Sequence, residues 1–201
     1  MLEIYENDYW HDFQITVGEK KIEERHQEFE MISVERIEYI QKFKNIGKFL
    51  DVGCSLGYLV NAAKNKGFDA YGIDLNQKDL SFGSEKYSVN LKKSLIKDYD
   101  SWDFDVIASF NVIEHVSYPN KMLLEMKKRI KQDGLVVIGT HDIECKNHLQ
   151  EKENWKHIIP NEHMYFFSIK SLNNLAQDVG LKLIHAYKPI KNGFVGYFKN
   201  A

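Results

Sequence analysis

Residues 49–58 read Phe49-Leu50-Asp51-Val52-Gly53-Cys54-Ser55-Leu56-Gly57-Tyr58, a short apolar run that ends in a turn with two glycines. The run predicts a strand over residues 48–52, and a helical pattern follows the turn as far as Lys66. Gly53 and Gly57 let the backbone turn sharply and approach a ligand closely, where a side chain would collide. The stretch therefore predicts a strand–turn–helix unit whose turn can hold a ligand.

A second strand pattern follows the helix and ends in a carboxylate, Asp74. An acid at this place lies beside the first turn and can accept two hydrogen bonds from a ribose diol. A glycine turn alone is a weak signal, because many α/β proteins need glycine there merely to turn. Together, the turn and the acid predict a site for a nucleoside-type cofactor rather than a purely structural turn.

The spacing of the glycines separates two classes of cofactor. The dinucleotide fingerprint G-x-G-x-x-G is absent, because Ser55 stands between Gly53 and Gly57. A pyrophosphate prefers bare N–H groups and a helix N-terminus. The acid at the end of the first strand, Asp51, instead suits a ligand that carries an ammonium group. A nicotinamide oxidoreductase is therefore the less favoured interpretation.

Length and composition predict one globular domain, residues 1–201, because 201 residues supply one full core and little more. Hydrophobic residues make up 43% and charged residues 28%, the balance of an ordinary soluble protein. The formal net charge is −2 and no long basic block occurs, which argues against a nucleic-acid partner. The composition thus favours a small-molecule substrate, and it leaves the oligomeric state open.

The chain has no apolar run of about 18 residues, so no membrane span is expected. The N-terminus lacks the basic start and apolar centre of a signal peptide. The two cysteines, Cys54 and Cys145, show no C-x-x-C spacing, so neither a disulfide framework nor a zinc site is indicated. We expect a reducing, cytoplasmic compartment.

Strand and helix patterns alternate along the chain, which predicts a parallel α/β sheet with right-handed crossovers. Further strands are expected over residues 70–74, 88–91, 103–110, 135–139, 181–187 and 194–198, and helices over 20–43, 56–66, 77–86, from Pro119 to a break at Gly134, and from an N-cap at Ser168 to Gly180. The turn Lys191-Asn192-Gly193 indicates that the last two strands form an antiparallel hairpin. The expected fold is a single Rossmann-like domain with a mostly parallel seven-stranded sheet and helices on both faces.

Residues 1–45 are expected to form an N-terminal arm and helix. Aromatic side chains are frequent in the opening stretch, residues 1–16. This stretch is interpreted as an arm packed on the domain, or alternatively as a lid in which Tyr9 or Trp10 covers the cofactor.

The motifs resemble those of the class I S-adenosylmethionine-dependent methyltransferases. Residues 51–57 resemble the first motif, D-x-G-x-G-x-G, with Ser55 in place of the middle glycine. Residues 104–116 resemble the fourth-strand motif that ends in Glu-His, and residues 132–138 resemble the entry to the fifth strand, with only Gly134 of its P-G-G kept. Residues 162–168 resemble the H-x-x-x-[FY]-[FS] segment of the small quinone-, sugar- and lipid-modifying branch.

This resemblance implies S-adenosylmethionine as the cofactor and a set of residues that hold it. The implied first-motif contacts are Asp51, Gly53, Cys54, Ser55 and Gly57, with Asp51 and the Gly53 backbone on the methionine ammonium. It also implies that Asp74 takes the ribose hydroxyls, that Leu75, Leu95 and Ile96 lie around the adenine, and that Phe110 and Asn111 close the site near the sulfonium. Leu95 stands where the family often has an Asp, so the adenine amine would turn to a backbone carbonyl or to Asp98.

Methyl transfer from a sulfonium is an in-line displacement, so the enzyme must align the acceptor, exclude water and remove a proton from a hydroxyl. Residues 141–167 form a long strand-to-helix connection with four of the eight histidines, and we interpret them as a substrate cover. His141, directly after the fifth strand, is the first candidate base, followed by His115 and His163. Each is equally consistent with a structural hydrogen-bonding role, with Glu114-His115 bracing a loop and His163 orienting the cover.

No metal site is predicted, because Asp142, His141 and His163 have no recognisable metal-binding spacing. The expected function is methyl transfer to a small molecule, most readily to an oxygen of a sugar, a quinone-like ring or a related metabolite. The alternative is a module that binds S-adenosylmethionine and has lost turnover, which the departures at Ser55 and Leu95 leave open.

Overall fold

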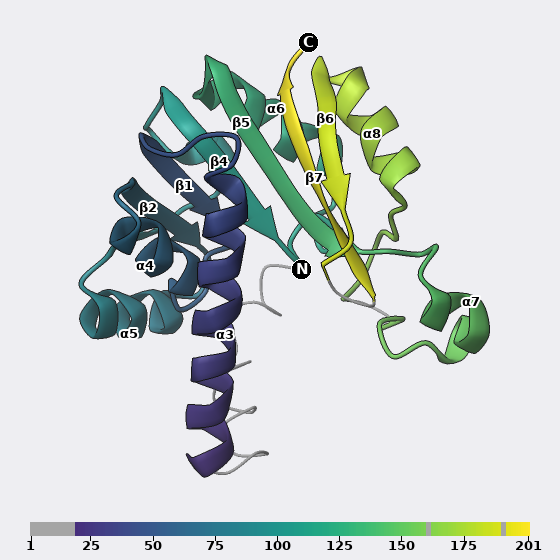
Figure 1. Cartoon of the computed structure of the whole chain (residues 1–201), viewed down its shortest axis with the longest axis horizontal. Helices are drawn as coiled ribbons and strands as arrows, with labels where there is room; N and C mark the ends of the chain where they lie inside the picture. Colours follow the sequence, from purple (N-terminus) through teal and green to yellow (C-terminus); the bar gives the residue numbers. More distant parts are fainter. Residues whose placement is uncertain (1–18, 160–161, 190–191) are drawn as a thin grey trace. The chain divides into compact units, whose positions relative to one another are not determined.

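The computed structural model describes residues 19–159, 162–189 and 192–201, so the expectations for the aromatic opening stretch lie outside the described part (Figure 1). The strands are β1 (Lys48–Val52), β2 (Asp69–Asp74), β3 (Asn90–Lys93), β4 (Phe104–Phe110), β5 (Ile130–His141), β6 (Leu181–Tyr187) and β7 (Gly193–Asn200). The helices are α3 (Glu19–Ile40), α4 (Tyr58–Asn65), α5 (Gln77–Tyr87), α6 (Pro119–Arg129), α7 (Lys146–Glu151) and α8 (Ile169–Asp178), with 3₁₀ turns η1 (Ile96–Asp98) and η2 (Lys152–Asn154).

The seven strands follow the order β3-β2-β1-β4-β5-β7-β6, which confirms the predicted α/β sheet. The chain divides into two compact units, residues 1–99 and 100–201, which we call the amino-terminal and carboxy-terminal units and describe separately.

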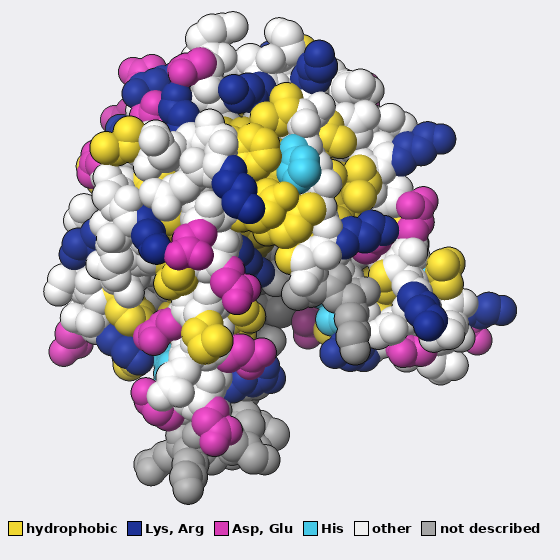
Figure 2. All heavy atoms as spheres, in the orientation of Figure 1, with side chains coloured by type: hydrophobic (Ala, Val, Ile, Leu, Met, Phe, Trp, Pro, Cys, Tyr) yellow, Lys and Arg dark blue, Asp and Glu magenta, His cyan; other side chains and the backbone are white. Residues whose placement is uncertain are grey.

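The amino-terminal unit is built on three parallel strands. β1 pairs with β2 so that Val52 lies opposite Ile73, and the carboxyl ends of these two strands therefore meet at one edge. The expected helix over residues 20–43 is one continuous element, α3, whose Ile37 and Ile40 are fully buried while α3 packs on α4. Elsewhere α3 shows charged side chains of both signs to solvent (Figure 2).

The carboxy-terminal unit holds the antiparallel part of the sheet. β4 runs parallel to β5, with Phe110 opposite Gly139. β7 runs antiparallel to both β5 and β6, which confirms the predicted hairpin strands. In Figure 1, α8 lies along β6, and the two elements are in contact.

The entry to the fifth strand differs from the prediction. We expected Gly134 to end the preceding helix, but α6 ends at Arg129 and β5 already begins at Ile130. The pairing between β4 and β5 shifts register at this point. Phe104 pairs with Ile130, but the next pair is Val106 with Leu135, so β5 has extra residues between the two pairs. A Cβ on Gly134 would lie 2.9 Å from the carbonyl oxygen of Lys131, so this glycine permits a tight bulge inside the strand.

Two other predicted boundaries shift slightly along the chain. α4 begins at Tyr58 rather than at residue 56, since Gly57 is its N-cap. β3 begins at Asn90 rather than at residue 88, because α5 continues to Tyr87 and Ser88 turns through the left-handed region, with φ 52°.

Candidate functional site

The glycine turn, residues 53–57, follows β1 and is tied to β2 by its own backbone. The N–H groups of Gly53 and Cys54 both donate to the carbonyl of Ile73, at 2.8 and 3.1 Å, and Gly57 N–H donates to the carbonyl of Cys54 at 2.8 Å. Gly53 and Gly57 have φ values of 79° and 77°, which a side chain would strain. Main-chain hydrogen bonds therefore hold the shape of the turn.

Asp74 ends β2 and holds the same turn from the other side. Its Oδ2 accepts a hydrogen bond from Ser55 N–H at 2.8 Å, and its Oδ1 accepts from Leu75 at 2.6 Å and Asn76 at 3.0 Å. A carboxylate oxygen has two lone pairs, so Oδ2 keeps one for a further donor. The structure thus places Asp74, which we expect to bind the ribose, against the glycine turn. Its contact with the ribose stays a prediction.

Ser55 replaces the middle glycine of the resembled motif yet follows a left-handed backbone path, with φ 45°. Such a conformation is strained for a residue with a side chain. Here the Ser55 hydroxyl donates to Oδ2 of Asp79 at 3.1 Å, an interaction that helps to hold the serine in place. The departure from the motif therefore keeps the turn and adds a side-chain contact to α5.

Three carboxylates gather around the turn, and sequence reasoning missed the third, Asp79. Asp51 is 4% exposed and Asp79 is 7% exposed. Burial raises the pKa of Asp51 to about 7, against a lowering by Arg36 and with a further rise from Asp74. Burial likewise raises the pKa of Asp79 to about 6, with the Ser55 hydrogen bond opposing it.

Asp79 could have been found from its place in the first turn of the predicted helix over residues 77–86, shortly after Asp74, but no motif singles it out. A site lined with carboxylates at this strand edge attracts a cation and repels a phosphate. This charge fits an ammonium and sulfonium ligand.

The residues expected beside the adenine lie in the loop after β3. Ser94 N–H donates to the carbonyl of Asp74 at 3.1 Å, so this loop starts next to the end of β2. Leu95 is 39% exposed and precedes η1, whereas Ile96 is buried. Leu95 can therefore offer apolar surface to a flat ligand, while Ile96 anchors the loop in the core.

In the carboxy-terminal unit, Phe110 ends β4 and Asn111 begins the loop that follows. A Cβ on Gly139 would lie 2.3 Å from the Phe110 ring, so the ring occupies space that only glycine leaves on β5. Asn111 takes a left-handed conformation, with φ 55°, and its N–H donates to the carbonyl of Gly139 at 2.9 Å. The contact of both residues with the cofactor stays a prediction.

A buried acid–imidazole pair joins the ends of β4 and β5. Glu114 is 1% exposed, and its Oε1 lies 3.3 Å from Nδ1 of His141, the last residue of β5. Burial alone would raise the pKa of Glu114, but His141, the local backbone and His115 together hold it below its ordinary value. Glu114 is therefore favoured in its carboxylate form, with the imidazole of His141 beside it.

A third residue, His157, lies beside this pair, although no sequence motif pointed to it. Its ring centroid lies 3.9 Å from that of His141, and its Nε2 lies 3.4 Å from the side-chain amide of Asn192. Burial lowers the pKa of His157 to about 4, helped by His141, Lys156 and His163, so the ring is neutral near pH 7. Its position in a histidine-rich connection was the only available hint.

The other two predicted catalytic histidines are held through their Nδ1 atoms. His115 Nδ1–H donates to the carbonyl of Glu162 at 2.9 Å, and His163 Nδ1–H donates to the carbonyl of His157 at 2.5 Å. The carbonyl of Glu114 accepts from Met164 N–H at 2.9 Å. Residues 114–115 thus brace the cover segment, residues 141–167, and the structure brings His115, His141 and His163 together.

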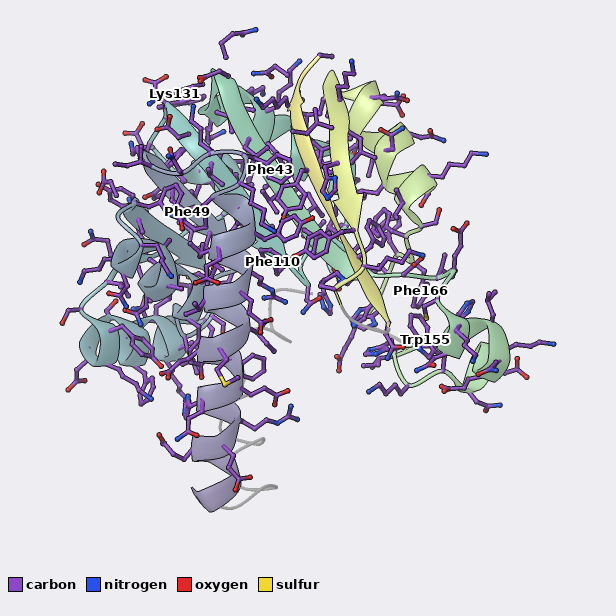
Figure 3. All side chains as sticks on the ribbon, in the orientation of Figure 1. Phe43, Phe49, Phe110, Lys131, Trp155 and Phe166 are labelled. Carbon is purple, nitrogen blue, oxygen red and sulfur yellow. The ribbon has the colours of Figure 1, made fainter. Side chains whose placement is uncertain are left out.

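In its described parts, residues 141–159 and 162–167, the cover segment contains the helical turns α7 and η2 (Figure 1). Trp155 belongs to the cover segment and is only 1% exposed (Figure 3). Its ring meets those of His141, His148 and His157 edge-on, with centroids 6.1, 5.0 and 4.9 Å apart. Trp155 therefore fixes the cover segment against the imidazoles.

Asp142 has a structural role, because it binds neighbouring parts of the chain. It is fully buried, its Oδ2 lies 2.6 Å from Lys188 Nζ, and its Oδ1 accepts from Glu144 N–H at 2.9 Å. The structure does not assemble Asp142, His141 and His163 as one set of ligands. In the described part of the chain it instead brings one ligand atom each of Glu114, His115 and His163 within 4.8 Å of one another.

The strand order and the acidic glycine turn define an S-adenosylmethionine-dependent methyltransferase, and comparisons with known proteins agree. The methyltransferase domain family profile matches residues 24–186, so the chain belongs to this family. This assignment confirms the expected cofactor and replaces the nicotinamide alternative. No helix in the described ranges is long and apolar enough to cross a membrane.

Among curated proteins, the chain is 33% identical over 99 residues to a ubiquinone biosynthesis O-methyltransferase of Rickettsia bellii, a match that covers 46% of the chain and 41% of the relative. The chain thus spans about two fifths of the length of that relative. A ubiquinone biosynthesis O-methyltransferase of Methylococcus capsulatus is 27% identical over 179 residues, which cover 79% of the chain and 76% of the relative.

Among solved structures, a SAM-dependent methyltransferase from Archaeoglobus fulgidus superposes with a TM-score of 0.71 at 17% identity, over 96% of this chain and 100% of that one. Magnesium protoporphyrin IX methyltransferase from Synechocystis, with bound SAH, gives a TM-score of 0.69 at 11% identity, over 86% of this chain and 83% of that one. These likenesses establish the fold.

Proposed function

We propose that this methyltransferase domain transfers the methyl group of S-adenosylmethionine to an oxygen of a small molecule, such as a sugar, a quinone-like ring or a related metabolite. The relatives named as ubiquinone biosynthesis O-methyltransferases support an oxygen acceptor of this class. The observation that supports the proposal is the buried pair of Glu114 and His141 at the end of β5, which would serve as the proton acceptor for an acceptor hydroxyl bound there.

The cofactor is held, in this proposal, by the amino-terminal unit. Asp51 and the carbonyl of Gly53 bind the methionine ammonium, since both are acceptors at the end of β1. Asp74 binds the ribose, with the free lone pair of its Oδ2 accepting from one hydroxyl. Leu75 and Leu95 lie against the adenine in this proposal.

The reaction is a displacement at the methyl carbon. The acceptor oxygen forms a bond to the methyl group as the carbon–sulfur bond breaks, and S-adenosylhomocysteine leaves as a neutral thioether. The hydroxyl proton passes to Nε2 of His141, because Nδ1 already faces Glu114. Glu114 fixes the tautomer and orientation of the imidazole, and the cover segment keeps water out.

His115 and His163 position the cover segment in this proposal, because each uses Nδ1 to bind a backbone carbonyl. We propose that the chain forms a single methyltransferase domain, of which the structure describes residues 19–159, 162–189 and 192–201. We also propose a reducing, cytoplasmic compartment, which the two free, buried thiols of Cys54 and Cys145 support.

The test is methyl transfer from labelled S-adenosylmethionine to a panel of catechols, phenols and sugars. We expect one O-methylated product and, for His141→Gln, a fall in kcat of ~10²–10⁴-fold, the usual contribution of a general base. Affinity for S-adenosylhomocysteine should not change. The matched control is His185→Gln on β6, which should retain full kcat.

Two outcomes would contradict the proposal. Full activity of His141→Gln would remove His141 from the proton transfer. Tight binding of S-adenosylhomocysteine with no methyl transfer to any acceptor would instead favour the binding-module alternative.

A further inference from the structure

Glu114, His115 and His163 form a compact group in the carboxy-terminal unit. One ligand atom from each lies within 4.8 Å of the other two. Two of the residues come from the loop after β4 and the third from the cover segment, so the fold joins segments that are far apart in the sequence. The imidazole centroids of His115 and His163 are 4.7 Å apart and meet edge-on.

Both imidazoles have a defined tautomer. A carbonyl oxygen only accepts hydrogen bonds, so Nδ1 carries the hydrogen in His115, which binds Glu162, and in His163, which binds His157. Each ring therefore presents the lone pair of Nε2. Metal-binding histidines commonly have this arrangement, with the second ring nitrogen donating to a backbone carbonyl or a carboxylate.

The carboxylate of Glu114 is the second, independent observation. Its side chain is 2% exposed, and within the part of the chain that the structure describes its Oε2 has no hydrogen-bond partner. A buried carboxylate without such partners is costly, and most buried polar atoms are paired. His141 Nδ1, 3.3 Å from Oε1, approaches one oxygen and leaves the other without a partner.

We propose that Glu114, His115 and His163 bind a divalent cation of the zinc type, with His141 orienting the carboxylate. Imidazole suits zinc and neighbouring first-row ions, and two histidines with one glutamate are a known zinc ligand set that leaves a coordination position open. Ligand atoms at about 2.1 Å from a tetrahedral zinc ion lie roughly 3.4 Å apart, so binding must draw the three ligand atoms closer together. The open position takes water or an oxygen donor.

This site is distinct from the cofactor site of the amino-terminal unit, and binding of the cation does not depend on methyl transfer. It gives the unpaired oxygen of Glu114 a partner. The cation also gives His115 and His163 a shared role, as its ligands, that is separate from cofactor binding and from the proton transfer to His141.

The test is calorimetric titration of the full chain, freed of metal by a chelator, with Zn²⁺ alone. We expect one ion per chain and a rise in the unfolding temperature when Zn²⁺ is present. His163→Gln and Glu114→Gln should each weaken Zn²⁺ affinity by at least ~10-fold, because each removes one ligand. His185→Gln should bind Zn²⁺ as the unchanged chain does.

Co²⁺ supplies a readout of geometry, since a site of low coordination number gives an intense visible absorption that His163→Gln should abolish. If Glu114→Gln fails to fold, as judged by circular dichroism, His163→Gln decides alone, because its side chain is only partly buried. The proposal is overturned if the chain binds no Zn²⁺, or if His163→Gln and His185→Gln change the affinity equally.

Discussion

The glycine turn of the amino-terminal unit and the cover segment of the carboxy-terminal unit are built in different ways. The turn, residues 53–57, is held by backbone N–H groups that donate to Ile73 and Asp74, the end of the next strand along the chain. The cover segment is held by contacts between residues far apart in sequence, such as Glu114 with Met164 and His115 with Glu162. A site made of local backbone bonds can be predicted from spacing, whereas one made of distant side chains cannot.

The same contrast predicts different responses to mutation. Damage to the cover segment should stay local, because Trp155 packs on rings that belong to the same segment. Damage to the glycine turn should appear in cofactor affinity, because main-chain hydrogen bonds hold the shape of the turn.

Trp155→Ala should have the largest effect, and it should be confined to the cover segment. Replacing a fully buried tryptophan by alanine costs about 3–5 kcal/mol. We expect that loss in the free energy of opening of residues 142–159, measured by amide hydrogen exchange, while the amides of the glycine turn keep their protection. Leu149→Ala, an exposed position on α7, is the control and should leave exchange unchanged. Equal loss of protection in both regions would show that the cover segment is not a separate unit.

Asp74→Ala should weaken binding of S-adenosylhomocysteine by up to roughly 100-fold. The carboxylate accepts three backbone N–H bonds and, in the proposal, one ribose hydroxyl. A hydrogen bond to a charged group contributes ~1.5–3 kcal/mol, so loss of the ribose hydrogen bond alone weakens binding by roughly 10- to 100-fold. The measurement is calorimetric titration, with Glu38→Ala, an exposed acid on α3 that pairs with Lys66, as the control. Unchanged affinity in Asp74→Ala would refute the cofactor site.

Affinity for S-adenosylhomocysteine should fall as pH drops below about 7. Asp51 has its pKa raised to about 7 by burial, against Arg36 and with Asp74, and only its ionised form attracts the ligand ammonium. Below that pH the ligand must displace a proton, so affinity should fall by up to ~10-fold per pH unit. Asp79, with its pKa raised to about 6, makes the fall steeper at lower pH.

The free protein should respond to pH in the opposite sense. The folded state binds the Asp51 proton more tightly than the unfolded chain does, so the free energy of unfolding should decrease as pH rises from about 4 to 7. Asp51→Asn should flatten both profiles near pH 7. Titrations in two buffers of different ionisation enthalpy count the released protons, and no proton release at pH 6.5 would exclude Asp51 as the ammonium ligand.

Local signals predicted most of the fold. β1 and β6 match their predicted residues, and α5 begins where its N-cap, Asn76, indicates. The error at Gly134 arose because a glycine after a helical pattern normally marks a helix end. The chain leaves the helix earlier, at Arg129, whose guanidinium stacks 4.4 Å from the Trp102 ring and pairs with Glu125. The packing on Trp102 joins residues distant in the sequence, which no local pattern reveals.

The site divides in the same way. The positions of Gly53, Gly57 and Asp74 follow from motif spacing, and the structure brings all three together. Asp79 and His157 were missed. Asp79 reaches the glycine turn only once α5 has folded, and His157 reaches His141 only once the cover segment has folded. The metal-ligand group likewise draws on Glu114 and His163, residues whose proximity requires the cover segment to return to the end of β4.

Ser168→Ala tests whether a feature can be predicted from sequence because its contacts are local, whichever of the two units it belongs to. Ser168 belongs to the carboxy-terminal unit, yet its role as the N-cap of α8 was predictable. Its Oγ accepts from Ser171 N–H at 3.2 Å, and Ser171 Oγ accepts from Ser168 N–H at 2.9 Å, which forms a capping box. Loss of such a cap costs about 1 kcal/mol, measurable by urea unfolding, while Asn174→Ala on α8 should change stability by less than about 0.5 kcal/mol. Equal stability of the two variants would mean that packing on β6, not the local cap, sets the start of this helix.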